Sequence, residues 1–142
     1  MVFVYVFILL VALWKFAEWV APWHDLSEAG CVLGYVYDGD TVELKCGGES
    51  RTTRLVGFDT PETTEPGCAE EAALGRQATL RLRELVASGP VTLDGVGRDK
   101  YGRLLATLSV NGRDVGETLI EAGLAVAYRG GSRVNWCERL AR

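Results

Sequence analysis

Residues 31–46 read CVLGYVYDGDTVELKC, in which two runs rich in valine, leucine and tyrosine flank the turn residues Asp38-Gly39-Asp40. Beta-branched and aromatic residues favour strands, and an Asp-Gly dipeptide between two such runs is typical of a hairpin. The sequence therefore predicts two antiparallel strands, residues 31–37 and 41–45, joined by a bend that carries two carboxylates.

Further strands and two helices are predicted beyond this hairpin. Glycine and proline punctuate the chain between them, and alanine and leucine recur at helical spacing in the two helices. This order of elements suits an α+β protein that is mainly β, a five-stranded OB-fold barrel with two to three helices, preceded by an N-terminal hydrophobic helix. The predicted strands are 51–58, 91–93 and 104–110, and the predicted helices are 69–87 and 115–122.

The N-terminus is a separate apolar segment. Residues 2–14 are 13 consecutive apolar residues, and continuing to Val20 gives about 30 Å of helix, the thickness of a bilayer core. We therefore divide the chain into a membrane anchor or signal segment at residues 1–23, a connector at 24–30 and a folded domain at 31–142.

Two cellular locations remain open for this arrangement. A retained anchor would hold the domain outside the cytoplasm, whereas a cleaved signal segment would give a secreted or periplasmic protein. Ser27-Glu28-Ala29 offers a cleavage site with small residues at both ends, but no basic residue precedes the apolar run. A helix buried within the protein is the third alternative.

The four cysteines permit three complete pairings. Cys31 and Cys46 lie seven and six residues from the two ends of the predicted bend, so they face each other across the ladder. Cys68 is then left to pair with Cys137, which ties the C-terminus back onto the domain. The alternative is four free thiols in a reducing compartment. A metal site made of cysteines is not expected, because no two of them have the close spacing of such sites.

Charge is distributed unevenly along the chain. Residues 1–95 carry 7 basic and 14 acidic side chains, whereas residues 96–142 carry 8 and 5. This balance argues against a protein that coats nucleic acid with a broad basic face, because such binding depends on many phosphate contacts. It is compatible with an enzyme that gathers acids around a cation and keeps a few arginines for one phosphate. The only histidine, His24, lies outside the predicted domain, which disfavours histidine chemistry.

Two carboxylate clusters fall at predicted strand ends. Asp38 and Asp40 lie in the first bend, and Asp59 and Glu62 flank Thr60 at the end of the third strand. Carboxylates from separate strand ends with a backbone carbonyl nearby are the ligands that a hard divalent cation such as calcium prefers. Taken alone, each cluster has an ordinary alternative, a hairpin turn in the first case and the approach to a helix in the second.

Arginines complement these acids, since a planar guanidinium can bind two phosphate oxygens and stabilise the charge of a five-coordinate phosphorus. Arg54 lies five residues before Asp59, so we expect both side chains to face one cleft. Arg103 closes a turn-like segment, residues 99–103, whose ordinary alternative is a solvated loop.

Together these segments are far more specific than any one of them. In this order and at these separations they resemble the staphylococcal-nuclease, or thermonuclease-like, family. The resemblance covers about residues 31–128. The fold of that family, an OB-type barrel with helices, agrees with the predicted elements. The resemblance rests on Asp38-Gly39-Asp40-Thr41-Val42, on Arg54-Leu55 followed by Asp59-Thr60-Pro61-Glu62, and on Asp99-Lys100-Tyr101-Gly102-Arg103.

The resemblance implies a role for each of these residues. In that family, two carboxylates and a backbone carbonyl bind calcium, a neighbouring acid is usually proposed as the general base, and two arginines hold the scissile phosphate. The implied assignments are Asp40, Asp59 and Thr60 for calcium, Arg54, Glu62 and Arg103 for catalysis, Lys100 and Tyr101 for substrate binding, and Asp38 as a supporting acid behind the metal ligands.

The implied function is that of a calcium-dependent phosphodiesterase, an endonuclease that hydrolyses DNA or RNA with low sequence specificity through metal-activated water. The expected partners are single-stranded or double-stranded nucleic acid and, through the N-terminal segment, a membrane; we expect a monomer. The alternative is a membrane-tethered OB module that binds nucleic acid without cleaving it. A purely structural membrane domain would leave the clustered motifs unexplained.

The chain departs from the family prototype in three respects. The segment between the second predicted helix and Tyr128 is one residue shorter than in the prototype, which puts a base-stacking role of Tyr128 in doubt. The prototype has no cysteine, so the predicted disulfides rest on geometry and compartment and not on the resemblance. The chain is also acidic where the prototype is basic, so we expect weaker substrate affinity and a stronger salt penalty on binding.

Overall fold

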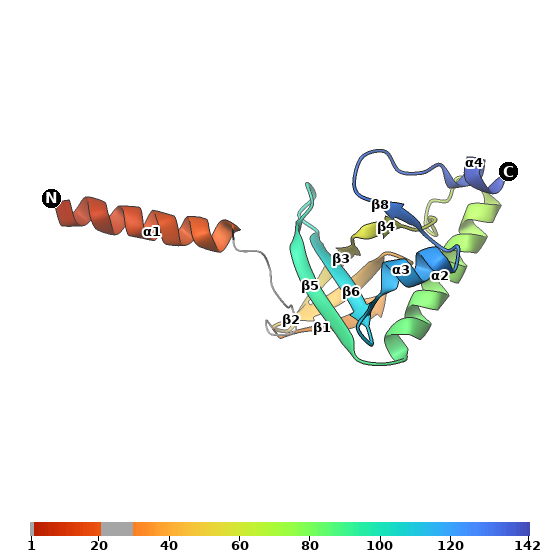
Figure 1. Ribbon diagram of the computed structural model, residues 1–142, viewed down its shortest axis with the longest axis horizontal. Helices are drawn as coiled ribbons and strands as arrows, with labels where there is room; N and C mark the ends of the chain where they lie inside the picture. Colours follow the sequence, from red (N-terminus) through yellow and green to blue (C-terminus); the bar gives the residue numbers. More distant parts are fainter. Residues whose placement is uncertain (1, 21–29) are drawn as a thin grey trace.

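The computed structural model describes residues 2–20 and 30–142, with side chains for residues 4–15 and 30–142. In Figure 1, a strongly curled sheet is closed by helices α2 and α3, and the C-terminal helix α4 lies beside the start of α2. The described elements are α1 Val2–Val20, β1 Cys31–Val36, β2 Thr41–Cys46, β3 Glu49–Leu55, β4 Gly57–Asp59, α2 Ala69–Ala87, β5 Val91–Arg98, β6 Leu104–Val110, β7 Arg113–Asp114, α3 Val115–Glu121, β8 Val126–Tyr128 and α4 Trp136–Leu140.

The main sheet has the strand order β1-β2-β3-β6-β5, with the short β7 paired to β6. The β3–β6 pair is parallel and the other pairs are antiparallel. This curled sheet with its helices confirms the predicted mixed fold, mainly β and of the OB type. The hairpin at residues 31–46 and the helix at 69–87 lie where the sequence predicts them.

The core lies inside the curl. Side chains of β6 alternate between buried and half-buried along the strand, as a sheet with one covered face requires. Leu82 of α2 and Leu119 of α3 are fully buried in the same cluster as Leu44 of β2. Burial of each such leucine stabilises the fold by about 1.5–3 kcal/mol, so the helices are held onto the sheet chiefly by their apolar faces.

The third strand differs from the prediction. Instead of running unbroken through residues 51–58, it ends at Leu55, and the chain turns into β4, which pairs with β8 in a separate two-stranded sheet. Gly57, with φ +97°, permits this change of direction because it has no Cβ. The break carries Asp59, the last residue of β4, away from the main sheet. Strand β5 is longer than predicted, since a bulge between Gly95 and Gly97 lets the ladder continue to Arg98.

Both predicted disulfides are present. Cys31 and Cys46 are direct partners in the β1–β2 ladder, with 4.1 Å between their Cα atoms. Cys68, which precedes α2, is joined to Cys137 of α4 with 5.9 Å between the Cα atoms. The second bridge therefore fixes the C-terminal helix against the start of α2.

The predicted N-terminal hydrophobic helix is present as α1, and the apolar side chains described along it are exposed, among them Phe7, Leu10 and Trp14. Within the part of the chain that the structure describes, no helix meets the length and hydropathy needed to cross a membrane. The proposed cleavage site and nearly all of the connector at 24–30 lie outside the described residues.

Gly75 of α2 allows the loop that carries Glu62 to lie against the helix. A Cβ at Gly75 would come within 2.7 Å of the carbonyl oxygen of Pro61 and 2.9 Å of that of Glu62. We expect Gly75→Ala to lower the free energy of unfolding by about 1–2 kcal/mol, because a clash of about 1–3 kcal/mol with backbone outweighs the gain of up to about 1 kcal/mol in helix propensity. Urea unfolding measures this change.

The matched control is Gln77→Ala, an exposed position on the same helix. Its free energy of unfolding should stay within about 0.5 kcal/mol of the parent. Equal stability of Gly75→Ala and Gln77→Ala would show that the loop is not seated on Gly75.

Candidate active site

The bend between β1 and β2 places one carboxylate inside the protein. Asp40 is only 2% exposed, although it follows a turn. Asp38 shapes this turn, because its Oδ1 accepts a hydrogen bond of 3.1 Å from the backbone N–H of Asp40. The Asp40 carboxylate in turn accepts from the Thr41 hydroxyl at 3.1 Å and from the backbone N–H of Thr60 at 3.2 Å. The first bend is thereby joined to the second.

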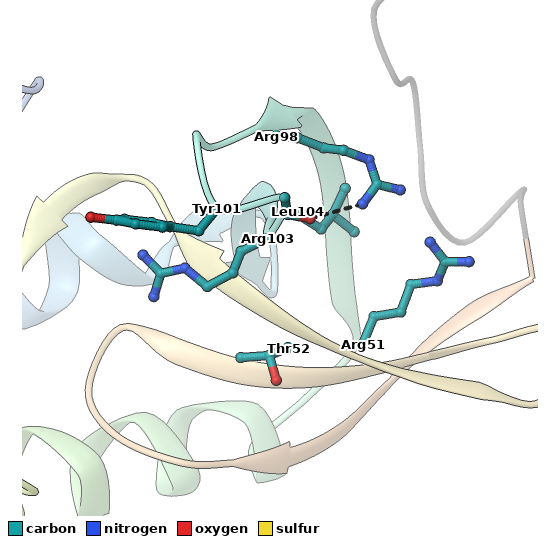
Figure 2. A pocket seen from close by; sticks show the side chains of 7 residues that line it. Arg51, Thr52, Arg98, Tyr101, Arg103 and Leu104 are labelled. Atoms are coloured by element: carbon teal, nitrogen blue, oxygen red, sulfur yellow. Dashed lines mark hydrogen bonds between the residues drawn. The ribbon is translucent and has the colours of Figure 1, made fainter.

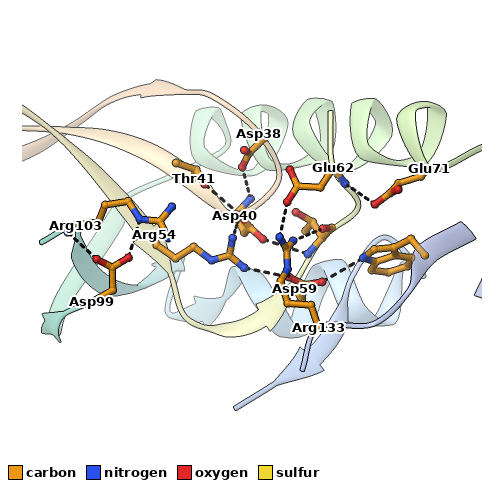
Figure 3. Close-up of polar contacts among 12 residues, drawn as sticks. Asp38, Asp40, Thr41, Arg54, Asp59, Glu62, Glu71, Asp99, Arg103 and Arg133 are labelled. Carbon is orange, nitrogen blue, oxygen red and sulfur yellow. Dashed lines mark hydrogen bonds and ion pairs between the residues drawn. The ribbon is translucent and has the colours of Figure 1, made fainter. Parts of the chain in front are cut away.

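Arg54 connects the two acidic bends directly. One guanidinium nitrogen, Nη1, lies 2.9 Å from Asp40 Oδ1, and the other, Nη2, lies 3.1 Å from Asp59 Oδ1 (Figure 3). Asp59 is completely buried. The predicted convergence of Asp40, Asp59 and Arg54 is therefore present in the structure, whereas the roles assigned to these residues stay predictions.

Arg133 is a member of this cluster that the sequence analysis missed. It lies between β8 and α4, and its Nε contacts Asp59 Oδ1 at 2.6 Å while Nη1 pairs with Glu62 Oε1. Its Nη2 donates to the backbone oxygen of Thr60 at 3.4 Å. Burial lowers the pKa of Arg133, but hydrogen bonds and charges from Glu62 and Asp59 outweigh it, so the pKa is raised and the guanidinium stays charged.

Trp136 completes the surroundings of Asp59. Its indole N–H donates to Asp59 Oδ2 at 3.2 Å, and the ring is buried. The only sequence signal for Arg133 and Trp136 was their place just before Cys137, whose predicted disulfide returns the tail to the domain. No motif within the tail itself points to the site.

The arginines and the predicted substrate-binding residues share one cleft of about 690 Å³. Arg103 lines this cleft, and its Nε lies 2.7 Å from Asp99 Oδ2. The Nζ of Lys100 lies 5.0 Å from the ring centroid of Tyr101. Tyr128 also lines this cleft, although its hydroxyl donates to the backbone oxygen of Gly131. The basic and aromatic lining consists of Arg54, Phe58, Lys100, Tyr101, Arg103, Tyr128, Arg129 and Arg133.

A smaller hollow of about 260 Å³ shares Tyr101 and Arg103 with this cleft, and Figure 2 shows the side chains that line it. It is lined by Arg51, Arg98 and Arg103 together with Tyr101, whose ring is largely exposed. Arg98 donates to the backbone oxygen of Gly102 at 3.0 Å, which holds the turn between β5 and β6. Basic side chains thus continue beyond the main cleft along the surface.

The donor atoms of the cluster fit a hard cation in kind. Asp40, Asp59, Glu62 and the carbonyl of Thr60 offer only oxygen, and calcium takes six to eight oxygen ligands. In the structure, the guanidinium groups of Arg54 and Arg133 bind these oxygens. The donor set is therefore of the right chemistry, but it is shared with arginine.

A second group of possible metal ligands can be set aside. Among the described residues, the ligand atoms of Cys68, Glu71 and Cys137 all lie within 4.8 Å of one another. The two sulfurs are joined in a disulfide, so neither can act as a thiolate ligand. Glu71 has a structural task instead, since its carboxylate accepts from the backbone N–H groups of Glu62 and Gly67 and so fixes the loop before α2.

Comparison with known proteins identifies the family of this chain. The family described as staphylococcal nuclease homologue matches residues 52–139, a span that includes Arg54, Asp59, Arg103 and Arg133. The chain belongs to the staphylococcal nuclease family. This confirms the family resemblance. The matched span begins after Asp38 and Asp40 and runs through the tail that carries Arg133.

Among the relatives of this family member is the protein named endonuclease YncB of Bacillus subtilis, 46% identical over 100 residues that cover 68% of this chain and 47% of the relative. The SPbeta prophage-derived endonuclease YokF of the same organism is also 46% identical over 100 residues, covering 68% of this chain and 33% of the relative. An uncharacterized endonuclease of Escherichia coli O157:H7 is 34% identical over 94 residues, 66% of this chain and 57% of the relative. The chain thus matches about a third to just over half of the length of these relatives.

Burial makes the ionisation of Asp40 unfavourable. Its pKa is raised to about 7, because removal from water outweighs the lowering by Arg54. A folded pKa above the unfolded value of about 3.9 means that the stability linked to this group is complete below about pH 4 and is lost as the pH rises through about 7. We expect the folded protein, measured in chelator, to lose more stability between pH 5 and pH 8 than an Asp40→Asn variant.

The expected difference between the two proteins is on the order of 2 kcal/mol, and urea unfolding at each pH measures it. The single histidine is present in both proteins, so its titration cancels in the comparison. Parallel pH profiles would show that Asp40 does not carry the raised pKa.

Proposed function

We propose that this protein is a calcium-dependent endonuclease that hydrolyses phosphodiester bonds of DNA or RNA with low sequence specificity. The observation that carries the proposal is the pairing of Asp40 and Asp59 through Arg54, which also lines a cleft with other arginines. Membership of the family and the names of the relatives, three of them endonucleases, support it.

The proposed division of labour follows from burial. Asp40, Asp59 and the Thr60 carbonyl lie inside the protein and would hold the cation, which supplies Lewis-acid stabilisation of the phosphate charge when it is bound. Glu62 is partly exposed next to this cluster, and a carboxylate in such a position can accept a proton from an attacking water. Its backbone is fixed by Glu71, so the side chain starts from a defined position.

The arginines would bind the phosphate. Arg54 and Arg103 both line the cleft, and a guanidinium can donate two hydrogen bonds to phosphate oxygens and stabilise the additional charge of the transition state. Asp99 holds Arg103 in its turn, which reduces the conformational freedom that phosphate binding would otherwise remove. Lys100 and Tyr101 lie beside them for contacts with the sugar and base.

A nucleic-acid strand needs further contacts along its backbone. The hollow between Arg51, Arg98 and Arg103 adjoins the main cleft, and we propose that it receives a phosphate next to the scissile one. Contacts of this kind carry no sequence information, which agrees with the low specificity proposed.

Cleavage of single-stranded DNA by the full chain, with calcium and with chelator, tests the catalytic proposal. We expect cleavage only with calcium, and a loss of at least about a hundredfold in Arg54→Ala and Glu62→Gln, since each removes a group that acts on the reacting phosphate or water. Arg81→Ala, an exposed arginine of α2 outside the cleft, serves as the control and should retain activity.

Two results would contradict this proposal. Strand binding without any cleavage would favour the alternative, a non-catalytic module tethered to the membrane. Cleavage that persists unchanged in Glu62→Gln and Arg54→Ala would mean that the catalytic groups lie elsewhere.

We further propose that the first residues hold the domain at a membrane or direct its export, with the domain outside the cytoplasm in either case. The exposed apolar side chains of α1 and the two disulfides support this, because disulfides persist in oxidising compartments. Fractionation of cells that express the chain, followed by mass spectrometry without reductant, should find it in the membrane or exported fraction with both bridges intact. Recovery in the cytosol with four free thiols would contradict the proposal.

A further inference from the structure

The contacts of Arg133 coincide with the atoms assigned to cation binding and water activation. Its Nε, Nη1 and Nη2 contact, in turn, the carboxylate of Asp59, the carboxylate of Glu62 and the backbone oxygen of Thr60 (Figure 3). One rigid, planar cation therefore gathers three of the oxygen donors from the second acidic bend. A divalent ion that used the same oxygen lone pairs would have to share them with Arg133 or replace it.

The charge balance favours replacement. When Asp40, Asp59 and Glu62 are all ionised, as they would be as ligands of a cation, three carboxylates face the two guanidinium groups of Arg54 and Arg133. Exchange of one guanidinium for a divalent ion would balance the charges of the cluster. Addition of the ion with both guanidinium groups in place would leave excess positive charge next to buried groups, which is costly at low dielectric.

Of the two arginines, Arg133 is the one placed to leave. Arg54 lies within strand β3 and its side chain is only 16% exposed, whereas Arg133 lies in the connection between β8 and α4 and is 39% exposed. Arg133 also lines the main cleft, together with Arg54 and Arg103. A rotation of its side chain would therefore move the charge from the acids toward a phosphate without taking it into solvent far from the site.

The tail around Arg133 is anchored independently of it. Trp136 donates to Asp59, and Cys137 is bonded to Cys68 at the start of α2. The main chain can thus stay in place while the arginine side chain changes partners. Arg133 differs in this respect from a residue whose salt bridge alone holds its segment to the domain.

We propose that Arg133 is an internal counter-ion of the acidic site, which holds Asp59, Thr60 and Glu62 until a divalent cation displaces it and then faces the phosphate of the substrate. The inference rests on the proposed nuclease function and adds a residue to it. It predicts effects of opposite sign when the side chain is neutralised, tighter calcium binding and weaker substrate binding. If Arg133 only positioned the acids, its neutralisation would weaken both calcium binding and substrate binding.

Calorimetric titration of the full chain with calcium, in the absence of nucleic acid, tests the first effect. We expect the dissociation constant for calcium to fall about three- to tenfold in Arg133→Gln, and the rise in melting temperature on addition of calcium to be larger than in the parent protein. Arg129→Gln is the control: it lies in the same connection and removes the same charge, but Arg129 contacts none of the three acids, so calcium affinity should change less than twofold.

The second effect is measured with single-stranded DNA at saturating calcium. Arg133→Gln should raise KM severalfold, because one guanidinium is lost from the main cleft, while kcat changes less. Unchanged or weaker calcium binding by Arg133→Gln would overturn the inference, even where the parent protein binds calcium and cleaves DNA. Absence of calcium binding in both proteins, with calcium-independent cleavage by the parent, would overturn the proposed function as well.

Loss of Arg133 leaves the buried Asp59 short of one partner, so the glutamine variant could fail to fold in chelator. Arg133→Lys is the second variant for that case, since a single ammonium can pair with one acid but cannot bind three oxygens in a plane. Its calcium affinity should lie above that of the parent protein. An affinity below that of the parent would overturn the inference on this variant too.

Discussion

The bond between the Arg54 guanidinium and the carboxylates of Asp40 and Asp59 is the interaction on which the rest of the structure depends. Both acids are buried, and two buried carboxylates brought together would repel each other and forfeit their hydration. Removal of the shared partner would leave uncompensated charge inside the protein, a loss of about 3–5 kcal/mol in typical cases. One side chain thus fastens the β1–β2 bend to the end of β4.

Much of this arrangement could be predicted from local pattern. The hairpin, its acidic bend and the helix at 69–87 follow from strand and helix periodicity with Asp-Gly and Gly-Pro at the ends. The Cys31–Cys46 bridge follows from register alone. The convergence of Asp40 with Asp59 was predicted less directly, since it depended on the family resemblance to bring together bends that are 19 positions apart in the sequence.

What could not be predicted depends on contacts between distant parts of the chain. Residues 51–58 have the composition of one strand, and the break at Val56 is stabilised by the pairing of β4 with β8, about 70 residues further along. Arg133 and Trp136 reach Asp59 by the same route, because β8 delivers the tail to the end of β4. Short segments carry no signal for such pairings; the predicted Cys68–Cys137 bridge was the one indication that the tail returns.

This long-range closure also gives a physical meaning to the uneven charge of the sequence. The acids of the site, Asp40, Asp59 and Glu62, come from the acidic part of the chain before residue 95, whereas Arg103 and Arg133 come from the basic part after it. Within the acidic part, Arg54 pairs with Asp40 and Asp59, whereas Glu62 pairs with Arg133 from the basic part. The negative charge of the acidic bends is therefore reduced further only when the C-terminal tail is in place, so the electrostatics of the cation site depend on the fold of the tail.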